Sequence, residues 1–257
     1  GLCPAENILV SDTDPERRAW VAATYGITDA ESNTEVAQNG DLVIFAVKPQ
    51  MIGAVLETLA HAGCFAAVSK RRLFISIAAG IPIKRIENTV YEGRSKTEKA
   101  MMPIIRVMPN TPALVSSGMS ALCANAYAEE ADIMMVLDML SAMGHALVVD
   151  EDKMNAVTAV SGSGPAYVFY FLEAMIAAGE KLGLDPETAS ELSRKTIEGA
   201  LKLIEERRET PRELRCKVTS PGGTTEAAIS VLDEKDVGNA VIAAIAAAAR
   251  RAEQLSR

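Results

Sequence analysis

The sequence predicts an α/β domain with a doubly wound parallel sheet, followed by an all-α domain. Three observations predict this fold. Residues 1–150 alternate short apolar runs with helical stretches, and residues 151–257 contain helical stretches alone. The apolar runs are continuous rather than alternating, which is typical of parallel strands covered on both faces. We therefore place a domain boundary near residue 150.

The first half contains six segments with the character of strands, separated by helical segments. The strand-like segments are residues 7–12, 41–49, 72–80, 104–110, 118–125 and 145–150. The helical segments are residues 14–26, 50–63, 81–91 and 129–143. In the first helix, Asp14 can cap the start, Pro15 suits the first turn and Gly26 can end it. The charged stretch 92–102 is predicted to be a solvated loop.

The second half is predicted to be five helices, whose bounds are residues 161–184, 185–207, 210–218, 224–234 and 236–255. Asp185 can cap the second of these, with Pro186 in its first turn. These helices are apolar and rich in alanine, and a domain of this size would leave much apolar surface exposed. We expect burial against a second subunit. A compact monomeric bundle is the alternative.

Charge and composition exclude several classes of partner. The net charge is −8, with acidic and basic residues mixed along the chain, which argues against a nucleic-acid surface. No apolar run reaches the length of a membrane span, and no secretory signal is present. The four cysteines have no metal-ligand spacing and the two histidines lie far apart. Reduced thiols of a cytoplasmic protein without a metal site are expected.

Ligands of open parallel sheets bind at the carboxyl ends of the strands. Those ends are predicted at Asp12 and at residues 46–49, 78–80 and 108–112. Lys48 would anchor a phosphate or an anionic substrate there, unless it is an ordinary surface lysine. No GxGxxG motif occurs in the first 60 residues. Either the given sequence lacks the first strand and glycine-rich turn of a Rossmann-like dinucleotide-binding domain, or the domain binds no dinucleotide.

A second candidate site is the stretch SPGGTT at residues 220–225. Pro221 and the two glycines stop one helix, and Thr224 and Thr225 begin the next. The first amides of a helix bind anions, and hydroxyl groups add donors without adding charge. We therefore predict a site for a small carboxylate. The alternative is an ordinary helix cap, which needs only one hydroxyl group.

Five stretches together resemble the pyrroline-5-carboxylate reductase family. They are AVKPQ (46–50), ISIAAGIPI (75–83), IIRVMPNTPALVSSGM (104–119), AVSGSGPAYVFYFLEAM (159–175) and VTSPGGTTEAAISVLDE (218–234). The resemblance implies a dinucleotide-binding domain over 1–150 and a dimerisation and substrate-binding domain over 151–257. It also implies reduction of the cyclic imine pyrroline-5-carboxylate to L-proline by NADPH or NADH. Members form dimers, often assembled into decamers, with each active site shared between two chains.

The resemblance also implies roles for individual residues. The cofactor would be lined by Asn33, Ala46, Val47, Lys48, Pro49, Ala78 and Ala79. The substrate would be held by Val218, Ser220, Gly223, Thr224 and Thr225. The Thr225 hydroxyl would face the ring nitrogen, which makes Thr225 the candidate catalytic residue.

Asp12 is the remaining cofactor candidate, because a carboxylate at the tip of this strand favours a free ribose diol and repels a 2′-phosphate. This predicts a preference for NADH, which Arg17 and Arg18 could offset. Two other functions stay open on the sequence alone. One is a related two-domain dehydrogenase of β-hydroxy acids, and the other is a dimeric binding protein without catalysis.

Overall fold

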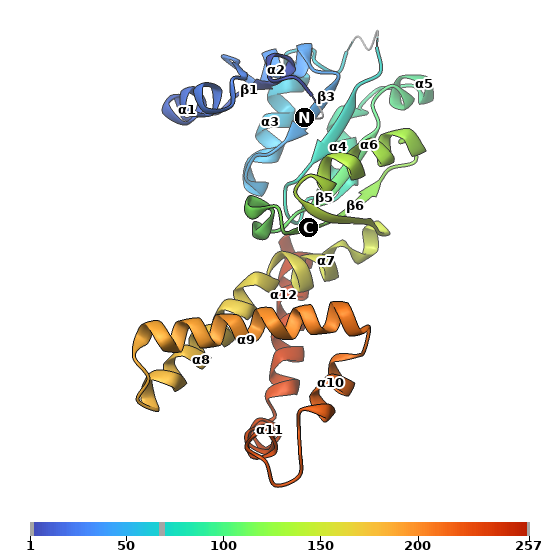
Figure 1. The fold of residues 1–257 in the computed structure, drawn as a ribbon. Helices are drawn as coiled ribbons and strands as arrows, with labels where there is room; N and C mark the ends of the chain where they lie inside the picture. The colour runs from blue at the N-terminus through green and yellow to red at the C-terminus, as the bar shows by residue number, and fades with distance from the viewer. Residues whose placement is uncertain (1–2, 67–69, 256–257) are drawn as a thin grey trace. The chain divides into compact units, whose positions relative to one another are not determined.

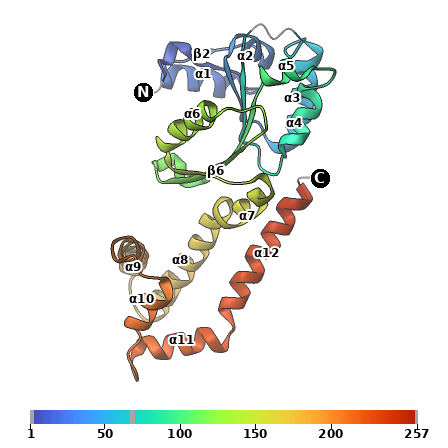
Figure 2. The ribbon, with the colours of Figure 1, turned by 90° about the vertical axis from the view of Figure 1, so that its right-hand side faces the viewer.

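The computed structural model describes residues 3–66 and 70–255 and divides the chain into two compact units. The N-terminal unit comprises the chain up to Gly162 together with the last residues from Ala249. The helical unit comprises Ser163–Ala248. Figures 1 and 2 show the chain from two directions.

A five-stranded sheet forms the centre of the N-terminal unit. Its strands, in spatial order, are β3 (Leu42–Phe45), β4 (Leu73–Ser76), β5 (Ile104–Met108), β6 (Gly118–Ala124) and β7 (Gly144–Val148). The pairs β3–β4, β4–β5 and β6–β7 are parallel, whereas β5 and β6 are antiparallel. The sheet is therefore mixed, where the sequence predicted a parallel one. The link from β5 to β6 holds a 3-10 turn, Thr111–Val115, and is too short for a parallel crossover.

Helices cover both faces of this sheet, as the continuous apolar strands predict. Along β4, Phe74 packs in one hydrophobic cluster, and Leu73 and Ile75 pack in another. The first cluster includes residues of α3 (Ile52–His61) and α4 (Ile83–Val90), and the second includes residues of α6 (Glu130–Ser141). Figure 2 shows the sheet between α6 on one side and α3 and α4 on the other. The doubly wound class is confirmed.

A separate two-stranded parallel sheet stands at the start of the chain, formed by β1 (Leu9–Val10) and β2 (Thr28–Asp29). Between them lies α1 (Pro15–Tyr25). The Asp14 carboxylate accepts hydrogen bonds from the first turn of α1, and Gly26 ends the helix in the left-handed conformation. The predicted start and end of this helix are confirmed.

Three elements of this unit were not expected. The stretch 92–102 is not loop throughout, because α5 (Lys96–Ala100) forms within it. Ser95 and Glu98 make a reciprocal capping box there, which stabilises even one short helix. Strand β2 and helix α2 (Asn33–Asn39) lie in a stretch for which the apolar pattern predicted no element.

The chain leaves the N-terminal unit through a 3-10 turn, Glu151–Lys153, then α7 (Met154–Val157) and a π-helical turn, Thr158–Gly162. A Cβ at Gly162 would lie 2.5 Å from Met108 Cε, so glycine allows the π-turn to approach the end of β5. A π-turn is common at functional sites.

The helical unit consists of helices alone, as predicted. They are α8 (Gly164–Lys181), α9 (Pro186–Arg207), α10 (Pro211–Lys217), α11 (Thr224–Glu234) and the greater part of α12 (Val237–Leu255). Helices α8 and α9 pack together (Figure 1), with a Cβ at Gly179 placed 3.0 Å from the Cβ of Ala189. Asp185 caps α9 as expected.

Much apolar surface of the helical unit is exposed. On α8 the side chains from Val168 to Phe171 are all exposed, and on α12 Ile242 is 66% exposed. Across the described residues of either unit, no helix has the length and hydropathy needed to cross a membrane.

Candidate functional site

Two predicted cofactor segments meet at one edge of the sheet. Strand β3 ends at Phe45 and is followed by Ala46–Pro49, while β4 ends at Ser76 and is followed by Ala78 and Ala79. Because β3 and β4 are parallel neighbours, both segments leave the sheet at its carboxyl edge. This is the edge at which a nucleotide-binding sheet receives its ligand.

The side chains at this edge fit a flat ring. Ala46 is exposed, and Ala79 is half-buried, so little side-chain volume stands between a ligand and the backbone. The Lys48 side chain is exposed and makes no ion pair with any residue that the structure describes. The small side chains leave room for a nicotinamide ring, and the Lys48 ammonium group can pair with a phosphate.

The end of β1 and the start of α2 are joined by a hydrogen bond. The Ser11 hydroxyl donates to Asn33 Oδ1 over 2.7 Å. Asp12, the next residue, is exposed and accepts from the backbone N–H of Asp14 over 2.9 Å. The structure thus brings Asp12 and Asn33, two predicted cofactor residues, into one neighbourhood.

Negative charge predominates at the start of α1. The Asp14 carboxylate stands next to Asp12 and accepts from the N–H groups of Glu16 and Arg17. Arg18 Nε lies 3.3 Å from the Asp29 carboxylate. The Arg17 guanidinium lies 4.6 Å from the centre of the Trp20 ring. Both arginines therefore have partners within the unit.

The stretch SPGGTT folds as a type II turn that leads into α11. Gly223 N–H donates to the Ser220 carbonyl over 3.0 Å, and Gly222 has a φ of +71°. Proline at the second position and glycine at the third are what this turn requires. A Cβ at Gly223 would lie 2.8 Å from Ser220 Oγ, so the second glycine is needed for space.

The first amides of α11 face no side-chain cap. Gly223 is the N-cap residue and offers no side chain, and its carbonyl accepts from Ala227 N–H. The N–H groups of Thr224 and Thr225 are in the first turn, where a helix supplies no acceptor. The N–H of Gly222, in contrast, donates to Glu226 Oε2 over 2.7 Å. Of the turn's amides, those of Thr224 and Thr225 are left for a ligand.

The remaining substrate candidate, Val218, borders this turn, and Thr219 lies between them. Val218 follows α10 directly and is 61% exposed. Thr219 donates its hydroxyl to the carbonyl of Arg215 over 2.6 Å and is thereby committed to ending α10. The predicted cofactor residues all lie in the N-terminal unit, and the predicted substrate residues all lie in the helical unit.

The contacts of Asn110, in the VMPNTP motif, were not predicted from the sequence. Asn110 Oδ1 accepts from Met119 N–H over 2.9 Å, and its Nδ2 donates to the Ser161 carbonyl over 3.3 Å. The end of β5, the start of β6 and the π-turn are tied together by one side chain. The two motifs VMPNTP and SGSGPAY were visible in the sequence. Their contact in the folded chain was not, because no local pattern predicts a contact between segments so far apart.

A partly buried ion pair was also missed. Arg106, in the middle of β5, is 4% exposed, and its Nη1 lies 3.3 Å from Glu151 Oε1. The same carboxylate oxygen accepts from the backbone N–H of Ile83 over 2.7 Å. Burial raises the pKa of the neighbouring Cys123 thiol to about 12, with the Glu151 charge adding to the shift. An arginine inside an apolar strand was the available signal.

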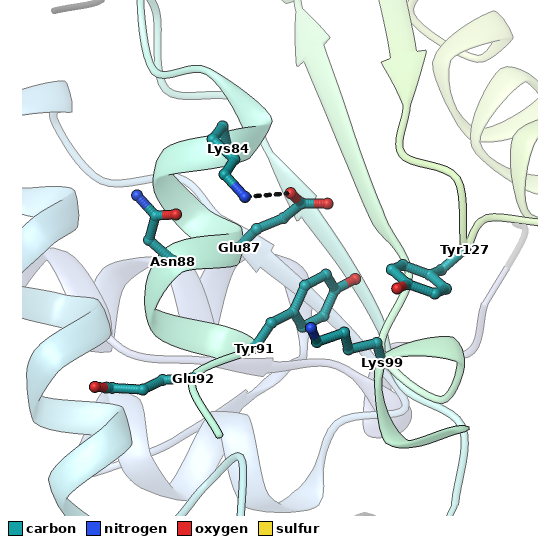
Figure 3. A pocket seen from close by; sticks show the side chains of 7 residues that line it. All are labelled: Lys84, Glu87, Asn88, Tyr91, Glu92, Lys99 and Tyr127. Atoms are coloured by element: carbon teal, nitrogen blue, oxygen red, sulfur yellow. Dashed lines mark ion pairs between the residues drawn. The ribbon is translucent and has the colours of Figure 1, made fainter. Parts of the chain in front are cut away.

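A polar pocket of about 300 Å³ lies along α4, and Figure 3 shows the side chains that line it. They are Lys84, Glu87, Asn88, Tyr91, Glu92, Lys99 and Tyr127. The buried Tyr91 hydroxyl donates to the Met102 carbonyl over 2.6 Å, and burial raises its pKa. No predicted site residue lines this pocket. It reaches toward the amino end of β5, the edge opposite to the one that binds ligands in parallel sheets.

The fold, together with two matching family models, defines an oxidoreductase of the nicotinamide class. The family described as "NADP oxidoreductase coenzyme F420-dependent" matches residues 1–80, and the family described as "Pyrroline-5-carboxylate reductase dimerisation" matches residues 151–255. The chain belongs to the pyrroline-5-carboxylate reductase family.

Relatives and solved structures support this assignment over nearly the whole chain. The pyrroline-5-carboxylate reductase of Pseudomonas aeruginosa is 43% identical, with 98% of this chain and 88% of the relative covered. That of Corynebacterium melassecola is 39% identical, with 98% and 90% covered. The structure of the Coxiella burnetii reductase has 36% identity, a TM-score of 0.83 and coverage of 97% and 88%. The Plasmodium falciparum pyrroline carboxylate reductase, solved with NADP bound, has 29% identity, a TM-score of 0.83 and coverage of 99% and 89%.

Proposed function

We propose that this chain reduces L-1-pyrroline-5-carboxylate to L-proline, the last step of proline biosynthesis, with hydride from NADH or NADPH. The observation that carries the proposal is the type II turn Ser220–Gly223, which leaves the first amides of α11 open beside two threonine hydroxyls. It occurs in a chain whose relatives of this name match over nearly its full length. The turn has the donors that a small carboxylate needs.

In this proposal the N-terminal unit binds the cofactor. Lys48 would pair with a phosphate oxygen, and the backbone at Ala46, Ala78 and Ala79 would contact the nicotinamide ring. Asp12 and Asn33 would meet the adenosine ribose, since the Ser11–Asn33 hydrogen bond holds this corner together. The reduced nicotinamide supplies the hydride.

The helical unit would bind the substrate. The N–H groups of Thr224 and Thr225, with the Ser220 hydroxyl, would hold the carboxylate. Gly223 leaves space for its approach, and Val218 would border the ring. The Thr225 hydroxyl would face the ring nitrogen and form a hydrogen bond with it.

Little proton transfer by side chains is needed for this reaction. A protonated cyclic imine has an electrophilic carbon that accepts hydride directly, so the protein must orient two reactants and exclude water. Orientation alone can lower a barrier by roughly 7–11 kcal/mol. This agrees with a site built from amides and hydroxyls, and it leaves Thr225 as the single catalytic side chain.

The helical unit assembles the chain into a homo-oligomer, in line with the dimerisation family that matches it. We further propose that each active site combines the N-terminal unit of one chain with the helical unit of its partner. Assembly of dimers into decamers, a domain boundary near residue 150 and a cytoplasmic location also belong to this proposal.

A reductase assay on the full-length chain tests the function. Pyrroline-5-carboxylate is offered with NADH and with NADPH, and oxidation of the nicotinamide is followed at 340 nm. Formation of one L-proline per nicotinamide oxidised is the expected result. Simple β-hydroxy acids are offered separately with NAD+ and NADP+, and their oxidation without reduction of the imine would favour the dehydrogenase alternative. No turnover of either substrate would favour a binding protein.

A further inference from the structure

We propose that Glu226 is a positioning residue of the substrate turn, and that its charge also limits how tightly the turn holds a carboxylate. The inference rests on the proposed function, because it concerns the same turn. Its basis is the hydrogen bond from Gly222 N–H to Glu226 Oε2, 2.7 Å long, inside a stretch predicted to bind an anion.

The positioning role follows from the hydrogen bonds of the turn. Gly222 has a positive φ, and glycine alone does not hold such a conformation rigidly. The turn's own hydrogen bond uses the Gly223 N–H and leaves that of Gly222 without a backbone acceptor. Glu226 supplies the acceptor from the first turn of α11. It thereby fixes the turn to the helix whose amides are to bind the substrate.

The charge of Glu226 acts in the opposite direction. Its carboxylate lies at the same helix start as the N–H groups of Thr224 and Thr225, so it repels a substrate carboxylate bound there. Lys217, the nearest preceding cation in the sequence, does not offset this charge freely, because its ammonium group contacts Glu209. The N–H dipoles at the start of α11 therefore attract an anion, and the negative charge of Glu226 weakens that attraction.

Two substitutions separate these effects. Glu226→Gln keeps an oxygen acceptor for Gly222 and removes the charge. Glu226→Ala removes both. Two negative charges about 6 Å apart in water repel each other by an energy that corresponds to about a three-fold change in a dissociation constant. We expect Glu226→Gln to lower KM for pyrroline-5-carboxylate about three-fold, and Glu226→Ala to have a KM about five-fold above that of Glu226→Gln, since the turn loses a hydrogen bond.

The experiment measures KM, kcat and the Kd of L-proline by calorimetry for the full-length enzyme and both variants. The Kd of the cofactor, measured by fluorescence, is expected to stay within two-fold. Glu234→Gln is the matched control, because it removes the same charge from the exposed far end of α11. Its KM is expected to equal that of the unaltered enzyme.

Equal KM values for the two Glu226 variants would overturn the positioning role, and an unchanged or higher KM for Glu226→Gln would overturn the role of the charge. A merely structural role predicts loss of stability in both variants without this split in KM. Failure of the proposed function itself looks different, because the unaltered enzyme would then not reduce the imine at all.

Discussion

The two units differ most in how they bury their apolar residues. The N-terminal unit has two hydrophobic clusters, one on each face of its sheet, with Phe74, Ile52 and Ile104 fully buried. In the helical unit, Ala189 and Ser193 are the buried residues within the range 163–248. Large side chains such as Phe169 and Tyr170 are exposed there.

This difference agrees with the match of the helical unit to a dimerisation family. One unit has its own core, and the other leaves apolar side chains that a second chain can cover. An exposed run of Phe and Tyr side chains is costly in water, and a partner's surface removes that cost. The proposed chemistry divides along the same line, with the cofactor on the self-sufficient unit and the substrate on the dependent one.

Replacing Phe169 with Asp is expected to abolish the dimer. Burial of one Phe side chain stabilises the dimer by roughly 1.5–3 kcal/mol, and the substitution removes this contribution from each chain. Each new carboxylate would also be forced into an apolar interface. The molar mass, measured by light scattering, is expected to fall to that of one chain, with loss of reductase activity.

Met134→Asp is the matched control in the N-terminal unit. Met134 is 51% exposed on α6 and Phe169 is 58% exposed on α8. Because the N-terminal unit already has its core, Met134→Asp is expected to keep the dimer. If Phe169→Asp remained dimeric, the comparison between the units would fail.

Thr225→Ala is expected to lower kcat/KM for pyrroline-5-carboxylate by about 10–100-fold. The reason is the loss of one hydrogen bond to a charged group, worth about 1.5–3 kcal/mol. The Kd of the cofactor is expected to change little, because the cofactor is assigned to the other unit. An unaltered kcat/KM would remove Thr225 from the site.

Asp12→Ser is expected to act on the cofactor alone. Removal of this carboxylate should shift the ratio of the Kd values for NADPH and NADH about ten-fold toward NADPH, since a 2′-phosphate no longer meets a like charge. Trp20, the one tryptophan of the chain, lies on α1 and reports binding by its fluorescence. A strong NADPH preference in the unaltered enzyme would contradict the assigned role of Asp12.

The smallest effect concerns the core of the N-terminal unit at high pH. Burial raises the pKa of Cys123 from 9.0 to about 12. The folded state therefore binds the thiol proton more tightly than the unfolded state does. The resulting contribution to the free energy of unfolding is fully present below pH 9 and is lost as the pH rises toward 12. Between pH 8 and 10 the free energy of unfolding should fall by about 1.4 kcal/mol more than in Cys123→Ala. Urea unfolding at both pH values measures this difference, and equal losses would contradict it.

Much of the fold could be predicted from local signals. Asp14, Pro15 and Gly26 marked α1 correctly, and the apolar runs at β3, β4 and β5 showed that both faces are covered. Local signals also gave the end of α10 and the start of α11, because proline fixes its own φ and glycine permits the positive φ that stops a helix. The position of SPGGTT between these helices is confirmed, whereas its ligand remains a prediction.

What the sequence did not predict depends on contacts between distant residues. The antiparallel direction of β6 is set by a short link and by pairing with β5, and neither appears in the composition of the strand. The hydrogen bonds of Asn110 to Ser161 cross 51 positions of the chain. The acceptor role of Glu226 was missed for a different reason, since a first-turn glutamate usually serves as an ordinary cap.

The two adjacent glycines of the substrate turn impose different stereochemical conditions. Gly222 occupies a region of φ that is natural for a D-amino acid, whereas Gly223 has an ordinary φ of −85° and simply lacks room. A chemically synthesised C-terminal segment could therefore carry D-alanine at position 222 and keep the bend intact. L-alanine at position 223, in contrast, would suit the backbone angle but would displace Ser220. Synthetic stereoisomers can thus distinguish a requirement for backbone handedness from a requirement for empty space.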